Sequence, residues 1–384
     1  MPQAPVQIAR LQAWALRVPL DRPVRTSFGE MHDRPAVFLR IEDADGGHGW
    51  GEVFANWPAA GAEHRVNLLE RDVAPLVLGW EGYEPSALFD ELEPRLRIRA
   101  LQCGEPGPFR QVVAGLDIAL WDLFARRRGV PLRRLIDPGA RDAVPAYASG
   151  IEIGAAPEAV DRARAAGFEA FKFKIGFDAA RDLAGLRELD AGLGAAERLS
   201  ADANQAWSPE QAERFVRSLG DIPLDWLEEP IAADAPDETW RALKRASPVP
   251  LAGGENLAGA AQFDAAIAAR ALGVLQPDVV KWGGITGCLR VARATLAAGL
   301  RYCPHYLGGG IGLLASAELL AAVGGDGRLE VDANDNPLRE VIAPTSEHLS
   351  TGNWACGQGP GLGLTALPDA FGLYLTRTID IGGS

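Results

Sequence analysis

Short apolar runs, each ending in a polar or charged residue, recur through the chain from about residue 144 onward. They alternate with amphipathic segments, such as PEAVDRARAAG at 157–167, which start with proline as helices often do. Seven runs end in polar residues that follow one another at intervals of 23 to 28 residues: Lys174, Asp202, Glu228, Glu255, Asp278, His305 and Glu330. This spacing is about one strand and one helix, and it predicts a parallel β/α barrel rather than an open doubly wound sheet. With VPAYASGI at 144–151 as the first strand, we expect eight strands.

The first part of the chain has a different pattern. Residues 7–57 alternate apolar and polar positions as an antiparallel sheet does, with a turn at Asp45-Gly46-Gly47, and residues 62–136 have helical periodicity. We therefore expect an α+β capping domain over residues 1–136 and a barrel domain over residues 137–349. A glycine-rich segment, residues 350–384, is expected to return to the cap. The predicted fold class is α/β, a (β/α)₇β modified TIM barrel with an N-terminal α+β capping domain.

Composition narrows the classes of partner. The 384 residues carry a formal net charge of −13, which argues against nucleic acid or an anionic membrane as the main partner. Residues 1–10 lack the apolar core of a signal peptide, and we find no run of about 18 apolar residues. Four cysteines without a CxxC pair are expected to be buried free thiols. These features predict a cytoplasmic protein.

Polar residues at successive strand ends converge on the C-terminal face of a barrel, where active sites lie. Asp202, Glu228 and Glu255 come from three adjacent strands. Carboxylate oxygens suit a hard divalent cation, so we expect one Mg²⁺ in each subunit, with Mn²⁺ as a substitute. Two further residues, Lys172 and Lys174, are two positions apart in a strand, so both side chains are expected inside the barrel. Near each other and a metal, one of them can have a lowered pKa and act as a general base.

His305 and Asp278 end neighbouring strands, so the carboxylate can hold one ring nitrogen while the other faces the pocket. Lys174 would then face one side of a substrate α-carbon and His305 the other. Proton abstraction gives an enediolate, stabilised by Mg²⁺, by Lys172 and by a hydrogen bond from protonated Glu330.

These residues resemble the enolase superfamily, and within it the mandelate racemase-like subgroup. The resemblance covers nearly the whole chain, through GWGEV, GLDIALWDL, KFK, DANQAW, WLEEP, GEN, PDVVKWGGITG, PHYLGGG and LEVD. It implies Asp202, Glu228 and Glu255 as metal ligands, Lys174 and the His305–Asp278 pair as opposed bases, and Lys172 and Glu330 as partners of the substrate carboxylate. It also implies that Asn204 contacts the α-hydroxyl region, and it suggests a homo-oligomer. In this family, the loops that carry Arg25, Ser27, His32, Trp50 and Trp57 close over the pocket.

Four further charged residues are expected to have structural roles. Lys281 lies an odd number of residues past Asp278, and Glu229 directly follows Glu228, so both are expected to point away from the pocket. Asp117 and Asp122 belong to the helical part of the cap. The muconate-lactonizing subgroup has Asp as its third ligand and Lys as the opposing base, whereas this chain has Glu255 and His305.

The predicted substrate is a small carboxylate, either an α-hydroxy acid or a sugar acid. Bases on both faces permit dehydration of a sugar acid or racemisation or epimerisation of an α-hydroxy acid. The polar cap segment SFGEMHDRP favours a polyhydroxylated substrate and hence an acid-sugar dehydratase. A barrel that binds such acids without turnover is the remaining alternative.

Overall fold

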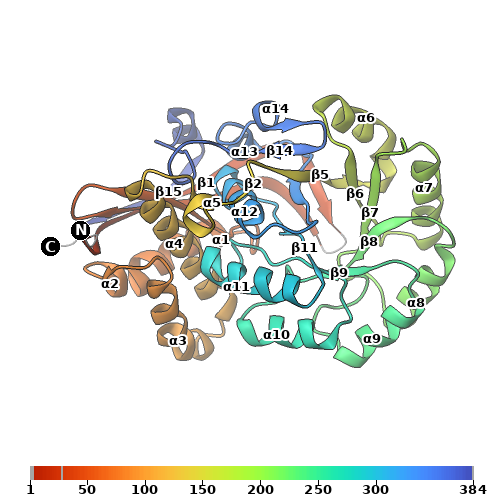
Figure 1. Cartoon of the computed structure of the whole chain (residues 1–384), viewed down its shortest axis with the longest axis horizontal. Coiled ribbons are helices and arrows are strands. Elements are labelled where there is room, and N and C mark those ends of the chain that lie inside the picture. The colour runs from red at the N-terminus through yellow and green to blue at the C-terminus, as the bar shows by residue number, and fades with distance from the viewer. Residues whose placement is uncertain (1–3, 27–28, 383–384) are drawn as a thin grey trace.

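The computed structural model describes residues 4–26 and 29–382, and for Arg22, Arg25, Thr26 and Ala156 it describes the backbone only. The chain forms an α+β cap and a β/α barrel, which lie side by side in Figure 1. The first and last strands of the described chain lie side by side in the cap, where Arg10 pairs with Gly382. This architecture confirms the predicted fold class.

The cap is built on an antiparallel sheet in the order β15-β1-β2-β3. Its strands are β1 (Val6–Thr26), β2 (Gly29–Asp43), β3 (His48–Val53), the short β4 (Glu81–Gly82), which pairs with β1, and β15 (Leu375–Gly382). The turn between β2 and β3 is held by Asp43, whose Oδ1 accepts hydrogen bonds from the backbone amides of Asp45 and Gly47. The turn predicted at residues 45–47 is confirmed.

Helices cover one face of this sheet. They are α1 (Gly61–Leu68), the π-helix η1 (Leu69–Val73), α2 (Ala74–Val77), α3 (Ala87–Gln102), α4 (Pro106–Arg127) and α5 (Leu132–Ile136). The strand β3 and α4 pack very closely, because a Cβ atom at Gly49 would lie 2.0 Å from the carbonyl oxygen of Ala119, and one at Gly51 would lie 2.1 Å from that of Gly115. The glycines of GWGEV are therefore required for this close approach.

Eight parallel strands form the barrel. In chain order they are β5 (Ala143–Glu152), β6 (Ala170–Lys174), β7 (Arg198–Asp202), β8 (Leu224–Glu228), β9 (Leu251–Gly253), β10 (Val274–Leu275), β11 (Arg301–Tyr302) and β12 (Leu329–Asp332). Neighbours in sequence pair in parallel from β5 to β11, and β12 pairs in parallel with β5. The first and last strands are thus adjacent, as a closed barrel requires.

Each of the first seven barrel strands is followed by a helix. They are α6 (Ala156–Ala166), α7 (Ala179–Ala191), α8 (Pro209–Ser218), α9 (Asp237–Ala246), α10 (Ala260–Ala269), α11 (Gly284–Ala297) and α12 (Gly310–Val323), and the short 3₁₀ helix η2 (Ile153–Ala155) precedes α6. The eighth strand is followed only by single-turn helices, α13 (Pro337–Glu340) and α14 (Thr345–His348). This is the (β/α)₇β arrangement.

The last segment of the chain contacts both parts. Strands β13 (Leu349–Ser350) and β14 (Asn353–Ala355) form a hairpin whose second strand pairs with β5, and the 3₁₀ helix η3 (Asp369–Tyr374) leads to β15. Strand β15 pairs antiparallel with β1 in the cap. The domain boundaries at 136 and 349 stay a prediction.

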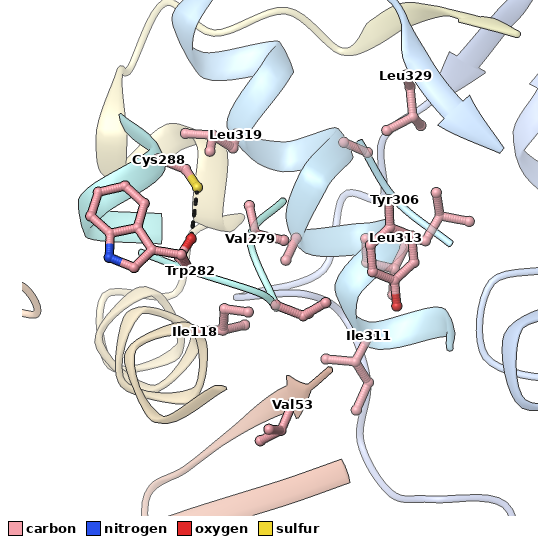
Figure 2. Close-up of a cluster of buried hydrophobic side chains, with 14 of the residues drawn as sticks. Val53, Ile118, Val279, Trp282, Cys288, Tyr306, Ile311, Leu313, Leu319 and Leu329 are labelled. Atoms are coloured by element: carbon pink, nitrogen blue, oxygen red, sulfur yellow. Dashed lines mark hydrogen bonds between the residues drawn. The ribbon is translucent and has the colours of Figure 1, made fainter. Parts of the chain in front are cut away.

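A continuous apolar core joins the cap to the barrel. Figure 2 shows Val53 of β3 and Ile118 of α4 in one cluster with Val279, Ile311 and Leu313 of the barrel domain. Glu52, next to Val53, reaches from the cap to the start of α12, where its carboxylate accepts hydrogen bonds from the amides of Gly309 (2.6 Å) and Gly312 (2.9 Å). This core holds the cap over the C-terminal end of the barrel strands.

In the part of the chain described here, no helix combines the length and apolar character needed to cross a membrane. All four cysteines are free, and Cys288, Cys303 and Cys356 are buried. Cys103 is exposed at the end of α3, so the expectation of buried thiols is wrong for that residue.

Candidate active site

A cavity of about 650 Å³ lies between the C-terminal ends of the barrel strands and the cap. On the barrel side it is lined by Lys174, Asn204, Glu255 and His305, which come from four different strand ends. On the cap side it is lined by residues that include Trp57, Arg65 and Gln111. Its size is that of a pocket for a small organic molecule.

Lys172 and Lys174 both lie inside the barrel, as their spacing predicts, and they are 0% and 6% exposed. Lys174 Nζ is 2.6 Å from Asp202 Oδ2. Burial disfavours the charge on Lys174, but Asp202, Glu228 and Glu255 together outweigh that effect, so its pKa is raised. Each lysine has carboxylate partners, and the pKa of Lys172 is raised as well. The lowered lysine pKa expected beside a bound metal stays a prediction.

Asp202 and Glu228 end the paired strands β7 and β8, and both are almost completely buried. Glu228 Oε2 accepts hydrogen bonds from Lys172, Gln276 and Trp226, whereas Glu228 Oε1 is buried without a partner. Burial and repulsion from Asp202 raise the pKa of Glu228 to about 7. A positive charge next to both carboxylates would relieve these effects.

The three predicted ligands fit a hard divalent cation by their chemistry and by this unpartnered oxygen. In residues 4–26 and 29–382, however, no three Asp, Glu, His or Cys side chains are grouped closely enough to hold a metal as they stand. The ammonium groups of the two lysines lie against Asp202 and Glu228, and the Glu255 carboxylate is 2.7 Å from His305 Nε2. The positive charges of the lysines and His305 thus lie directly against the three carboxylates.

His305 is held between carboxylates on both sides of its ring. Nδ1 is 2.8 Å from Asp278 Oδ2, and Nε2 is 2.7 Å from Glu255 Oε2, so each nitrogen donates a hydrogen bond. Burial opposes the charge, but Glu255 and Glu330, together with the bond to Asp278, raise the pKa of His305 well above its usual value. The structure therefore places His305 beside Asp278 as expected and holds it as an imidazolium.

Glu330 lies below the floor of the cavity and is 0% exposed. Its carboxylate accepts hydrogen bonds from Ser149 Oγ (2.5 Å) and the Tyr306 amide (2.9 Å), and it lies 2.6 Å from Lys172 Nζ. Burial works against ionisation, yet Lys172 and His305 outweigh it and lower the pKa of Glu330 to about 2. The expectation of a protonated Glu330 that donates a hydrogen bond is therefore wrong, because this side chain is an ionised acceptor.

Asn204 lines the cavity two residues after the end of β7. Its backbone amide donates to Asp202 Oδ1 (2.8 Å), and its side-chain amide donates to Asp202 Oδ2 (3.3 Å). The backbone φ of +44° turns the chain directly after the strand. Asn204 thus orients Asp202 while it faces the cavity.

Lys281 lies next to the site, so the expectation that it points away is wrong for this residue, whereas Glu229 does not line the cavity. Lys281 lines the cavity, 3.6 Å from Glu255 Oε2 and 3.0 Å from Asn256 Oδ1. Glu229 is 1% exposed and accepts hydrogen bonds from Asn256 Nδ2. The strand β10 ends at Leu275 and residues 279–283 form a turn, while Glu229 has a φ of +37°, so the alternation of a strand does not extend to either residue.

Asp117 and Asp122 bind backbone and structural groups, as expected. Asp117 accepts hydrogen bonds from the amide and hydroxyl of Thr286, which joins α4 to α11, and Asp122 accepts from the amides of Trp50 and Leu362. Neither of these aspartates lines the cavity.

The cap residues near the cavity are only partly those expected. Trp57 lines it, whereas Trp50 is in strand β3 in the cap core and His32 is exposed. Ser27 and the side chain of Arg25 lie outside the described residues. Arg34, the arginine of the polar segment SFGEMHDRP, is a buried cavity residue whose NH2 atom is 2.6 Å from Asp332 Oδ2 in β12. Asp332 lies two residues after Glu330 in the LEVD motif, so the sequence indicates that its side chain is on the same side of the strand as Glu330. Arg65 and Gln111 are cap residues of the cavity that the sequence did not indicate.

A cap on a (β/α)₇β barrel, with carboxylates, lysines and a histidine–aspartate pair at the strand ends, defines an acid–base enzyme of the enolase superfamily. Residues 10–137 match the family described as mandelate racemase/muconate lactonizing enzyme, N-terminal domain, and residues 155–370 match the enolase C-terminal domain-like family. The chain belongs to the mandelate racemase/muconate lactonizing enzyme family.

Several characterised relatives and solved structures are similar over nearly the whole chain. D-galactarolactone cycloisomerase of Agrobacterium fabrum is 28% identical, covering 95% of this chain and 98% of the relative, and arabinonate dehydratase of Saccharolobus solfataricus is 28% identical over 90% and 92%. A mandelate racemase/muconate lactonizing enzyme structure from Bordetella bronchiseptica is 51% identical with a TM-score of 0.90, covering 97% of this chain and 99% of that chain. This protein is thus a lyase or isomerase of the enolase superfamily.

Two further structures contain ligands. An enolase from Bradyrhizobium, complexed with magnesium and mandelic acid, is 30% identical with a TM-score of 0.83, covering 98% of this chain and 100% of that one. L-talarate dehydratase from Polaromonas, complexed with Mg and L-glucarate, is 28% identical with a TM-score of 0.79, covering 98% and 99%.

Proposed function

We propose that this protein binds Mg²⁺, abstracts the proton α to the carboxylate of a sugar acid, and then eliminates water from the β-carbon. The observation that carries the proposal is that Lys174 and His305, from β6 and β11, line the same cavity. A base and an acid are thus available at one pocket, each oriented by its own aspartate.

The metal ligands and the base have separate roles. Asp202, Glu228 and Glu255 would hold the ion, which when bound makes the α-proton of a coordinated carboxylate acidic and stabilises the enediolate. Lys174 takes the α-proton. Because the ion pair with Asp202 stabilises the protonated lysine, that pair must weaken before Lys174 can act as a base.

His305 acts as the acid in the elimination. Its two carboxylate partners hold it protonated, so it can give its Nε2 proton to the departing β-hydroxyl group. Asp278 keeps Nδ1 as a donor during this transfer. Lys172 and Glu330, below the cavity floor, supply a fixed charge pair for the substrate carboxylate, and Asn204 faces the α-hydroxyl.

Racemisation or epimerisation of an α-hydroxy acid is the second candidate, because the same two groups can exchange a proton across the α-carbon. Elimination is favoured by the polar residues of the cavity wall, which include Asn56, Asn256 and Asn334 and suit a polyhydroxylated chain. The relatives named as dehydratases and the neighbour with bound L-glucarate support the same choice. A non-catalytic barrel is set aside, because the characterised relatives are enzymes.

We also propose that the protein acts in the cytoplasm as an oligomer of identical subunits.

The test is incubation with Mg²⁺ in D₂O and a panel of aldonates and aldarates, followed by NMR. We expect α-carbon exchange and a 2-keto-3-deoxy product with at least one compound. Exchange with an inverted centre and no keto product would support the racemase, and no exchange with any α-hydroxy acid would contradict both candidates.

A further inference from the structure

Arg65 is a buried cation on the cap side of the cavity. It lies in α1 and is 2% exposed. Its Nε and NH2 atoms donate to Gln111 Oε1 at 2.8 and 2.7 Å, and NH2 also donates to the Trp57 carbonyl at 3.1 Å. Arg65 and Gln111 both line the same cavity as Lys174 and His305.

Arg65 differs from the other cations of this cavity in its partners. Arg34, Lys174 and Lys281 each lie within 4 Å of a carboxylate, at Asp332, Asp202 and Glu255. Within residues 4–26 and 29–382 the Arg65 guanidinium has no such carboxylate, and Glu105 is reached only through His64, which bridges the two at 3.2 and 3.1 Å. A buried cation with neutral partners is unfavourable unless a bound anion balances it.

Gln111 is oriented by Arg65 in a way that leaves donors for a ligand. Its Oε1 accepts both hydrogen bonds from Arg65, so its Nε2 is turned away from the guanidinium. No other described side chain or backbone oxygen accepts from this nitrogen, although Gln111 is only 8% exposed. An amide and a guanidinium side by side suit the two oxygens of a carboxylate.

We propose that Arg65 and Gln111 form a distal subsite for a second carboxylate, so that the substrate is a sugar diacid rather than a monoacid. One carboxylate is held at the barrel strand ends and the other at the cap, across a cavity of about 650 Å³. This inference rests on the proposed function and specifies its substrate class.

The test compares kcat/KM for six-carbon aldarates with kcat/KM for the aldonates of the same configuration, with Mg²⁺ present. We expect the wild type to prefer the diacid. Arg65→Gln and Gln111→Glu should each lower the diacid-to-monoacid ratio roughly tenfold to a hundredfold, because a charge-assisted hydrogen bond is lost or its cation is neutralised. Gln111→Glu keeps the side-chain size and gives Arg65 a carboxylate, so it tests the subsite if Arg65→Gln does not fold.

Arg71→Gln is the matched control, because it removes a cap arginine whose side chain is 77% exposed, and it should leave the ratio unchanged. A wild-type diacid-to-monoacid ratio of one or less, or a ratio unaffected by Gln111→Glu, would overturn the distal subsite. In that case, α-proton exchange with monoacids would still support the proposed function. If no compound is turned over, the proposed function fails. The subsite is then tested by calorimetry, which gives the ratio of the binding affinities for the same aldarates and aldonates. Diacid binding that is not weakened by Gln111→Glu would then overturn the subsite.

Discussion

Glu255 Oε2 lies 2.7 Å from His305 Nε2, so a predicted metal ligand and a predicted catalytic base are in direct contact. The two side chains come from the ends of β9 and β11, with β10 between them. The negative charge of Glu255 is the main reason that the pKa of His305 is raised despite burial. This contact links the ionisation of the base to the state of the metal ligand.

Glu255→Gln should lower the pKa of His305, because it removes that charge and leaves the bond to Asp278 in place. The measurement is an NMR titration of the imidazole signals, of which the chain has five. Glu347→Gln, at an acidic side chain outside the cavity, is the control and should leave the His305 signal unchanged. An unaltered titration in Glu255→Gln would show that Glu255 does not stabilise the imidazolium.

Lys174→Ala and His305→Asn should each reduce turnover by about 10² to 10⁴-fold, the usual contribution of a general acid or base. Their effects on α-proton exchange should differ. Lys174→Ala should abolish exchange on the face it serves, whereas His305→Asn should retain that exchange and lose the keto product. Deuterium incorporation and product formation, followed by NMR in one sample, separate the two. Exchange that survives in both variants would refute the base assignment.

Chelation with EDTA should abolish turnover, and Mg²⁺ or Mn²⁺ should restore it. Glu228→Gln should weaken Mg²⁺ binding by at least about tenfold in calorimetry, because the buried Oε1 that has no partner in the protein is replaced or neutralised. Glu213→Gln, on the exposed side of α8, should bind Mg²⁺ as the wild type does. Equal affinity in Glu228→Gln and the wild type would exclude Glu228 as a ligand.

Asp332→Asn should lower the free energy of unfolding by about 3 kcal/mol, because it leaves the guanidinium of Arg34 buried without its carboxylate. Urea denaturation measures the change. Asp380→Asn is the control: its partner Arg10 is at the same 2.6 Å, but the pair is exposed and screened by solvent, so a much smaller loss is expected. Similar losses in the two variants would mean that burial of the Arg34–Asp332 pair does not increase its contribution to the free energy of unfolding.

Glu52→Gln should change how stability depends on pH. Burial raises the pKa of Glu52 to about 7 from 4.5. Between these two values the unfolded chain releases the proton while the folded protein keeps it, so this group destabilises the folded state progressively as pH rises through that window. The stability of Glu52→Gln relative to the wild type should therefore increase between pH 4.5 and 7, by on the order of 3 kcal/mol. Urea denaturation at a series of pH values measures this.

The control for this experiment is Glu84→Gln, at an exposed cap position, which should show no such dependence. A constant difference between Glu52→Gln and the wild type across the window would show that Glu52 is ionised in the folded protein throughout.

The sequence by itself determined the order of the elements and the residues at the strand ends. The intervals of 23 to 28 residues reflect one strand and one helix, and inside strands the two-residue alternation correctly placed Lys172 and Lys174 in the barrel. Both are local properties of the chain, so they can be deduced without knowing the fold in detail.

Only the tertiary structure decided what lies beyond the strand ends and how charges are shared. Lys281 lies within a turn and Glu229 directly follows β8 with a φ of +37°, so the alternation of a strand no longer holds, and they lie next to Glu255 and Asn256. Glu330 is ionised because Lys172, 158 positions earlier in the numbering, lies 2.6 Å away across the barrel. Arg34 and Arg65 reach the cavity because the cap packs on the barrel. Electrostatic interactions depend on distance in space, and the folded barrel and cap set those distances.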